Sequence, residues 1–161
     1  MTRRTEEEPM SFSRSEFLKG ALAAWLWFLV IHQALLLVPT GGYGFVALYL
    51  TLPWSFGALV IGSPLAFSLG QALRRQRRSW VHIVAFAFFG LIIGVLTTAL
   101  ATWLSGESTQ YGWFLFASLT AVSACPAVVL GWWHAARHAR KSDSEKATKA
   151  ADIDAEYEDS L

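Results

Sequence analysis

The sequence predicts an all-α integral membrane protein, with four transmembrane helices in a bundle and both termini in the cytoplasm. Two observations carry this prediction. Of the 161 residues, 54% are hydrophobic and only 16% are charged, and the apolar residues fall in four long runs. An average soluble domain is about 25% charged. All 13 Lys and Arg residues lie in three blocks, at 3–19, 74–78 and 137–149, which separate or flank these runs.

Residues 1–16 are polar, and their low hydrophobicity predicts a mobile tail. Ser13 and Glu16 have the spacing of a capping box, in which each side chain bonds to the backbone of the other residue, so a helix is expected to begin there. The first apolar run covers about residues 17–38, close to the roughly 20 residues that a membrane-spanning helix needs. We expect this run to be a retained membrane helix.

The second apolar run, at 43–73, is longer than a straight span requires. As a helix it would extend for roughly 45 Å, against a hydrocarbon core of about 30 Å. Pro53 and Pro64 lie inside it, which predicts kinks and tilt. The third run covers 80–104, and the fourth covers 111–136 with Pro126 near its middle. Together the runs define an expected transmembrane domain at 17–141.

The basic residues predict the orientation of this domain. The segments between the first and second runs and between the third and fourth runs contain no Lys or Arg, whereas both ends of the chain and the 74–78 segment are basic. Because cytoplasmic loops of membrane proteins are enriched in Lys and Arg, the pattern favours cytoplasmic termini.

Small residues recur every four positions in the second and third runs. This spacing places them on one helix face, where helices can approach closely. The sequence leaves open whether these faces pack inside the bundle or against another subunit. The candidate helix-packing residues are Ala58, Gly62, Ala66, Gly70, Gly90, Gly94, Thr98 and Thr102.

No Asp, Glu, Lys or Arg lies in the core of any of the four runs, which argues against an ordinary proton- or cation-coupled carrier. His32 and Gln33, in the first run, form the candidate intramembrane polar site. We expect His32 to pack as a neutral side chain that hydrogen-bonds to Ser or Thr residues of neighbouring helices, such as Thr97 or Thr98. The alternative is a proton relay or a ligand contact.

Sequence motifs of enzymes are missing, including nucleophile elbows, HExxH helices and phosphate-binding loops. His134 and His138 are four residues apart and could hold a metal. However, the helix macrodipole also favours histidine near the carboxyl end of a helix, so the pair needs no metal to explain its position. We therefore expect no enzyme activity, no cofactor and no metal site.

A basic collar is expected where the helices meet the cytoplasmic headgroups, each residue contributing about 1 kcal/mol of attraction to anionic lipid. Its members are Arg74, Arg75, Arg77, Arg78, Arg137, Arg140 and Lys141. Residues 142–161 are rich in acids, which predicts a disordered cytoplasmic tail that is either solvated or available to a partner.

The function predicted first is that of a non-enzymatic accessory, scaffold or assembly subunit in a bacterial plasma membrane. Its expected partners are anionic lipid and another membrane protein or a second copy, with no nucleic acid. The alternative is a small oligomeric transport component whose substrate passes near the second run and His32.

Overall fold

The computed structural model describes residues 13–40, 44–106 and 110–159, and these residues form four helices. The helices are α1 (Arg14–Thr40), α2 (Gly44–Ala72), α3 (Ser79–Ser105) and α4 (Gln110–Asp159). Each contains a segment long and apolar enough to cross a membrane, at Arg14–Leu37, Gly44–Ala72, Ser79–Leu104 and Phe114–Glu145. The predictions of an all-α fold and of four helices with the character of membrane spans are confirmed for the described residues.

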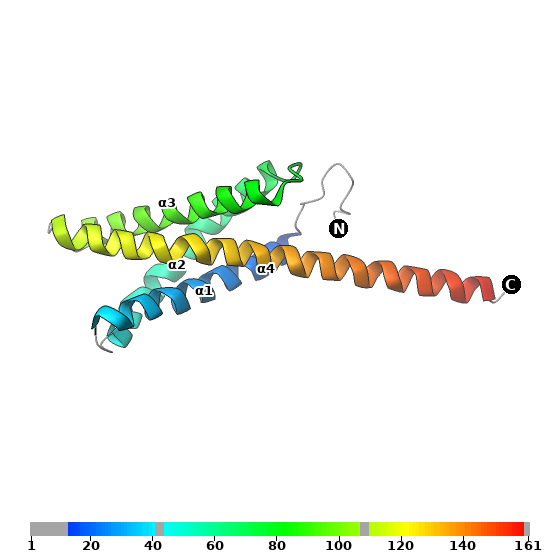
Figure 1. The fold of residues 1–161 in the computed structure, drawn as a ribbon, viewed down its shortest axis with the longest axis horizontal. Coiled ribbons are helices and arrows are strands. Elements are labelled where there is room, and N and C mark those ends of the chain that lie inside the picture. The colour runs from blue at the N-terminus through cyan, green and yellow to red at the C-terminus, as the bar shows by residue number, and fades with distance from the viewer. Residues whose placement is uncertain (1–12, 41–43, 107–109, 160–161) are drawn as a thin grey trace.

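Helix α4 lies between α1 and α3 and packs extensively against both (Figure 1). Helix α2 runs behind this three-helix layer, contacts α1 along part of its length and contacts α3 least. Within the described residues, the backbones of α2 and α4 do not come close. Helix α2 is therefore the most loosely packed of the four helices.

Small residues let α4 approach both of its neighbours. A Cβ atom added to Gly90 would lie 2.7 Å from the carbonyl oxygen of Ala124, and one added to Gly94 would lie 2.8 Å from the Cα of Ala121. These separations leave no room for a side chain at either of these two positions of α3. The small residues of α3 thus lie directly against the backbone of α4, where dispersion between closely packed helices is strongest.

The crossing of α1 and α4 uses a second set of small residues. A Cβ atom added to Gly20 would lie 2.7 Å from the Cβ of Ala135, and one added to Gly131 would lie 2.7 Å from the carbonyl oxygen of Gly20. The added atom at Gly131 would also overlap Ala24. Both faces of α4 therefore pack at backbone contact distance.

Helix α1 begins with the capping box that the sequence predicts. The backbone N–H of Ser13 donates to Glu16 Oε2 over 2.9 Å, and the backbone N–H of Glu16 donates to Ser13 Oγ over 3.2 Å. Two of the donors that a helix start leaves without partners are thereby satisfied. The first twelve residues of the expected tail lie outside the described residues.

Helix α2 keeps its two prolines inside one continuous helix. Pro64 has no N–H for the carbonyl of Val60, four residues earlier, but the Ser63 hydroxyl donates to that carbonyl over 3.3 Å. A polar side chain thereby satisfies a carbonyl that proline leaves free.

The sequence predicts a disordered tail at 142–161. In the structure the described part of this segment is helical, because α4 continues as one helix through Asp159. The physical reason lies in the composition of the segment and in its attachment to a helix that is already formed. Ala, Lys and Glu are strong helix formers, and extension of an existing helix avoids the cost of nucleation. Lys141 and Glu145 add an i,i+4 ion pair of 3.9 Å. This arm (142–159) projects away from the bundle (Figure 1).

Candidate functional site

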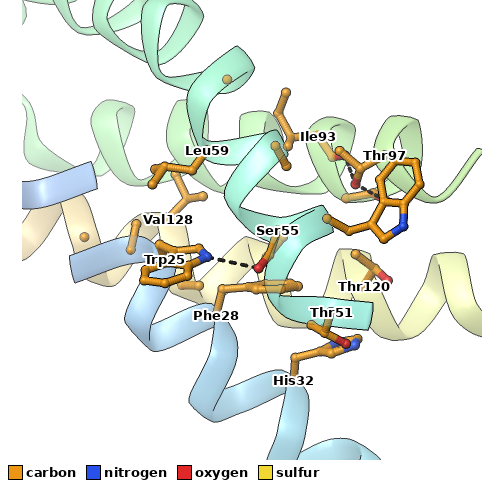
Figure 2. Close-up of a pocket in the computed structure, with 18 of the residues that line it drawn as sticks. Trp25, Phe28, His32, Thr51, Ser55, Leu59, Ile93, Thr97, Thr120 and Val128 are labelled. Atoms are coloured by element: carbon orange, nitrogen blue, oxygen red, sulfur yellow. Dashed lines mark hydrogen bonds between the residues drawn. The ribbon is translucent and has the colours of Figure 1, made fainter. Parts of the chain in front are cut away.

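A cavity of about 720 Å³ separates α2 from the other helices, and all four helices contribute to its lining (Figure 2). None of its described lining residues is an Asp, Glu, Lys or Arg. Most of the wall is apolar, with Leu, Phe, Ala and Gly side chains predominating. The space exists because α2 meets α1 at one edge and barely reaches α3.

The small residues of α2 face this cavity instead of another helix backbone. Ala58, Gly62 and Ala66 line it. A Cβ atom added to Gly62 would have the tip of Ile93, 3.8 Å away, as its only neighbour, and one added to Gly70 would have Phe86 at 3.9 Å. The two rows of small residues expected for packing thus lie in different surroundings, α3 against α4 and α2 beside an open space.

The remaining residues of the α3 row lie further along the helix. Thr98 is buried and its hydroxyl donates to the carbonyl of Gly94 over 2.9 Å, while the Thr102 hydroxyl donates to the carbonyl of Thr98 over 2.9 Å. Both threonines also line the cavity. Their protons are directed at their own helix, and the Thr98 oxygen offers a lone pair to the cavity.

One hydrogen bond ties α2 to α1 across the cavity wall. The indole N–H of Trp25 donates to Ser55 Oγ over 3.0 Å, and the Ser55 hydroxyl donates in turn to the carbonyl of Leu52 over 3.1 Å (Figure 2). The Trp25 ring also meets Phe56 edge to face, with 5.7 Å between ring centroids. These contacts hold the edge at which α1 and α2 meet.

His32 lines the cavity from α1 and is bonded to α4. Its Nδ1 atom lies 3.1 Å from Ser123 Oγ, and the Ser123 hydroxyl lies 2.7 Å from the carbonyl of Leu119. Because Ser123 has one hydroxyl proton and donates it to that carbonyl, Nδ1 of His32 must carry the proton of the first bond. The ring also stacks on Phe28 with 5.0 Å between centroids. Because the ring is buried among uncharged residues, the neutral form is favoured, and with the proton on Nδ1 the lone pair of Nε2 is left over.

The expected bond from His32 to a Ser or Thr of a neighbouring helix is present, but its partner is Ser123 of α4 and neither Thr97 nor Thr98. Thr97 and Thr98 donate to carbonyls of α3, over 2.7 Å and 2.9 Å respectively. The reason is packing order, since α1 lies against α4 and does not reach α3 within the described residues.

Gln33, the second member of the expected polar site, follows His32 directly in α1, so its side chain leaves the helix in a different direction. It is buried, and within the described residues its amide nitrogen and oxygen have no hydrogen-bond partner. It does not line the cavity. The structure thus places only His32 of this pair in the candidate site.

The other histidines lie toward the opposite end of the bundle. His82 is fully buried, stacks on Trp132 at 5.4 Å and bonds through Nε2 to the carbonyl oxygen of Gln76 over 3.0 Å. His134 and His138 bring their Nε2 atoms within 3.2 Å of each other. Among the described residues, no group of three or more His, Cys, Asp or Glu side chains has the arrangement of a metal site.

The expected basic collar gathers at this same end, where α1 begins and α2 connects to α3 (Figure 1). Arg137 lies over the ring of Trp133 at 5.3 Å, and Arg140 donates to the carbonyl of Ala136 over 3.2 Å. Apart from Arg74, which is half-buried and lies 3.5 Å from Gln71, the members are exposed. They are Arg75, Arg77, Arg78, Arg137, Arg140 and Lys141.

Several residues of the site and its frame were not among the sequence predictions. The spacing of Gly20 and Ala24, repeated in Gly131 and Ala135, could have identified the α1–α4 crossing, because small residues four apart share a face. Ser123 carries no such signal, since a serine in an apolar helix ordinarily bonds to its own backbone.

Together the fold and the cavity define a helical protein with the character of a multi-pass membrane protein and an uncharged internal site. No family model, no curated protein and no solved structure matches this chain. Its function is therefore argued from its own geometry.

Proposed function

We propose that this protein is a non-enzymatic membrane component that binds an uncharged, largely apolar molecule within the bilayer and takes part in its transport. The cavity between α2 and the other helices is the observation that carries the proposal. Its volume of about 720 Å³ falls within the usual range for small-molecule sites, about 300–1,000 Å³. The uncharged lining favours an uncharged occupant, because burying an unpaired charge there is costly.

The weak contact between α2 and α3 supports entry from the side. A molecule dissolved in the hydrocarbon layer can pass between two helices that barely touch, without crossing the tightly packed α1–α4 or α3–α4 seams. Ala58, Gly62 and Ala66 are small, so at these positions α2 projects no bulky side chain into the path of such a molecule. A cavity that can be reached between α2 and α3 favours transport over the accessory role that the sequence predicts first.

The orientation and the membrane are part of the same proposal. With the basic collar facing the cytoplasm, both termini are cytoplasmic, and the collar contacts anionic headgroups of a bacterial plasma membrane. The exposure of Arg75, Arg77 and Arg78 supports this contact, since headgroups can reach all three. His32 then lies toward the outer face.

The test uses quenching of tryptophan fluorescence by 1-bromohexadecane, with the full chain in phosphatidylcholine nanodiscs. Trp25 and Trp54 line the cavity, so a bound bromoalkane should quench them in a saturable manner. Ala58→Phe fills the cavity and should abolish the saturable part. Ile61→Phe is the matched control, because Ile61 is 69% exposed on the outside of α2. Quenching that never saturates, or that persists in Ala58→Phe, would contradict the proposal.

A second candidate is the accessory or assembly subunit, and the helical arm of α4 favours it. The arm extends for about 27 Å beyond Lys141 at 1.5 Å per residue, and it projects away from the other described helices (Figure 1). A charged helix of this length suits a cytoplasmic partner. Truncation after Lys141 should abolish co-isolation of that partner and leave quenching by 1-bromohexadecane unchanged. Co-isolation that survives truncation would exclude the arm as the contact.

A further inference from the structure

One corner of the cavity, here called the polar corner, is formed where α1 and α2 approach their connection. His32 contributes from α1 and Thr51 from α2, and Figure 2 shows both side chains directed at the same part of the cavity. The register agrees with this placement. The two helices run antiparallel, and Trp25 bonds to Ser55; Thr51 is one turn before Ser55 on α2, and His32 is two turns after Trp25 on α1. The two side chains therefore lie within about one turn of each other along the axis.

The two groups have opposite hydrogen-bonding capacity. The Nδ1 proton of His32 is committed to Ser123, so Nε2 is an acceptor, and no described residue donates to it. The Thr51 hydroxyl makes no hydrogen bond within the described part of the chain, so its proton is available. One free acceptor and one free donor thus face the same space.

We infer that this corner binds an alcohol, whose hydroxyl oxygen accepts a hydrogen bond from Thr51 while its proton is donated to Nε2 of His32. A hydroxyl is the group that can donate and accept through one oxygen atom. An ether or ester oxygen can only accept, and a carboxylate would bring a charge that no residue of the lining neutralises.

The rest of the cavity fits the remainder of such a molecule. From the polar corner the space continues along the small residues of α2 toward Val128 and Phe86, where the lining is apolar. The occupant is therefore an uncharged, lipid-like alcohol with its hydroxyl at His32 and its hydrocarbon part along α2. This inference rests on the proposed function, because it names the chemical class of the molecule that the cavity would take.

The experiment displaces 1-bromohexadecane from the full chain in phosphatidylcholine nanodiscs with hexadecan-1-ol or with hexadecyl methyl ether. We expect the alcohol to displace the probe at about fivefold lower concentration than the ether, because only the alcohol donates to Nε2 of His32 and one net hydrogen bond has this effect. Thr51→Val has the same shape without the hydroxyl and should weaken displacement by the alcohol and by the ether alike, because either oxygen can accept from Thr51. Thr51→Ser, the matched control, should leave both unchanged.

A second variant tests the histidine. His32→Asn retains an amide N–H that can donate to Ser123 but has no group at the position of Nε2, so the alcohol preference should fall to about onefold. Equal displacement by alcohol and ether in the unmodified chain would overturn the inference while leaving the cavity as a binding site. A preference that survives His32→Asn, or displacement by both ligands that Thr51→Val leaves unchanged, would overturn it as well. If 1-bromohexadecane shows no saturable quenching at all, the proposed function fails together with it.

Discussion

Gly94 of α3 and Ala121 of α4 lie so close that a Cβ atom on Gly94 would come within 2.8 Å of the Cα of Ala121 and 3.0 Å of its backbone nitrogen. Both atoms belong to the backbone, so no side-chain rotation can relieve such an overlap. The α3–α4 seam therefore depends on hydrogen as the side chain at this position.

Gly94→Ala should accordingly destabilise the protein, by about 1–3 kcal/mol as for other overpacked interfaces. The measurement is the thermal unfolding midpoint in detergent. Gly57→Ala is the control, since an added Cβ there meets nothing within 4 Å and alanine improves helix propensity equally at both sites. A midpoint that falls in both variants, or in neither, would show that the seam is not the cause.

The α1–α4 crossing should respond in the same way to Gly131→Ala. The added methyl group would overlap Ala24 and lie 2.7 Å from the carbonyl oxygen of Gly20, so α1 must move away from α4. We expect a lower unfolding midpoint and a His32–Ser123 bond that no longer forms. Gly70→Ala serves as control, because Phe86 at 3.9 Å leaves room for the methyl group. Equal midpoints for the two variants would contradict the packing described for this crossing.

Ser123→Ala should leave the Nδ1–H group of His32 buried without an acceptor. The cost expected in a membrane helix bundle is about 1 kcal/mol, since interhelical hydrogen bonds there average about 0.6 kcal/mol and reach about 1.7. Thr120→Val is the comparison variant, because the Thr120 hydroxyl bonds only to the carbonyl of Phe116 in its own helix, over 2.8 Å. If Ser123→Ala unfolds at the same temperature as Thr120→Val, the bond between α1 and α4 contributes nothing measurable.

The proposed orientation makes a separate prediction. Reporters that need the cytoplasm should be active when fused after Ser79 or Leu161, because these sites follow basic segments. Reporters that need export should be active at Gly42 or Glu107. An exported signal from the fusion after Leu161 would place the carboxyl terminus outside and would refute the orientation.

The four helices and their local capping follow largely from patterns that can be read directly in the sequence. The length and apolarity of each run reflect the thickness of a bilayer, which is why four helices of spanning character could be predicted. The capping box at Ser13 and Glu16 could be predicted because it depends on local spacing alone.

The site could not be predicted to the same degree, because it depends on which helices are neighbours. His32 was recognised as a polar group in an apolar helix, but its partner Ser123 became visible only once α1 was placed against α4. The row of small residues on α2 resembles the row on α3 in sequence, yet only the α3 row lies against a backbone. The helical arm was missed because its acidic composition is typical of disorder, whereas its attachment to α4 favours a helix.

Native mass spectrometry of the protein released from nanodiscs that contain hexadecan-1-ol tests the central claim most directly, because it counts bound molecules. Binding inside the cavity predicts a mass increase of about one alcohol per chain that saturates with concentration, as expected for one pocket of this size. The same species should be absent for Ala58→Phe and present for Ile61→Phe. A distribution of adducts that grows without limit, or that is identical for Ala58→Phe and the unmodified chain, would contradict an internal binding site.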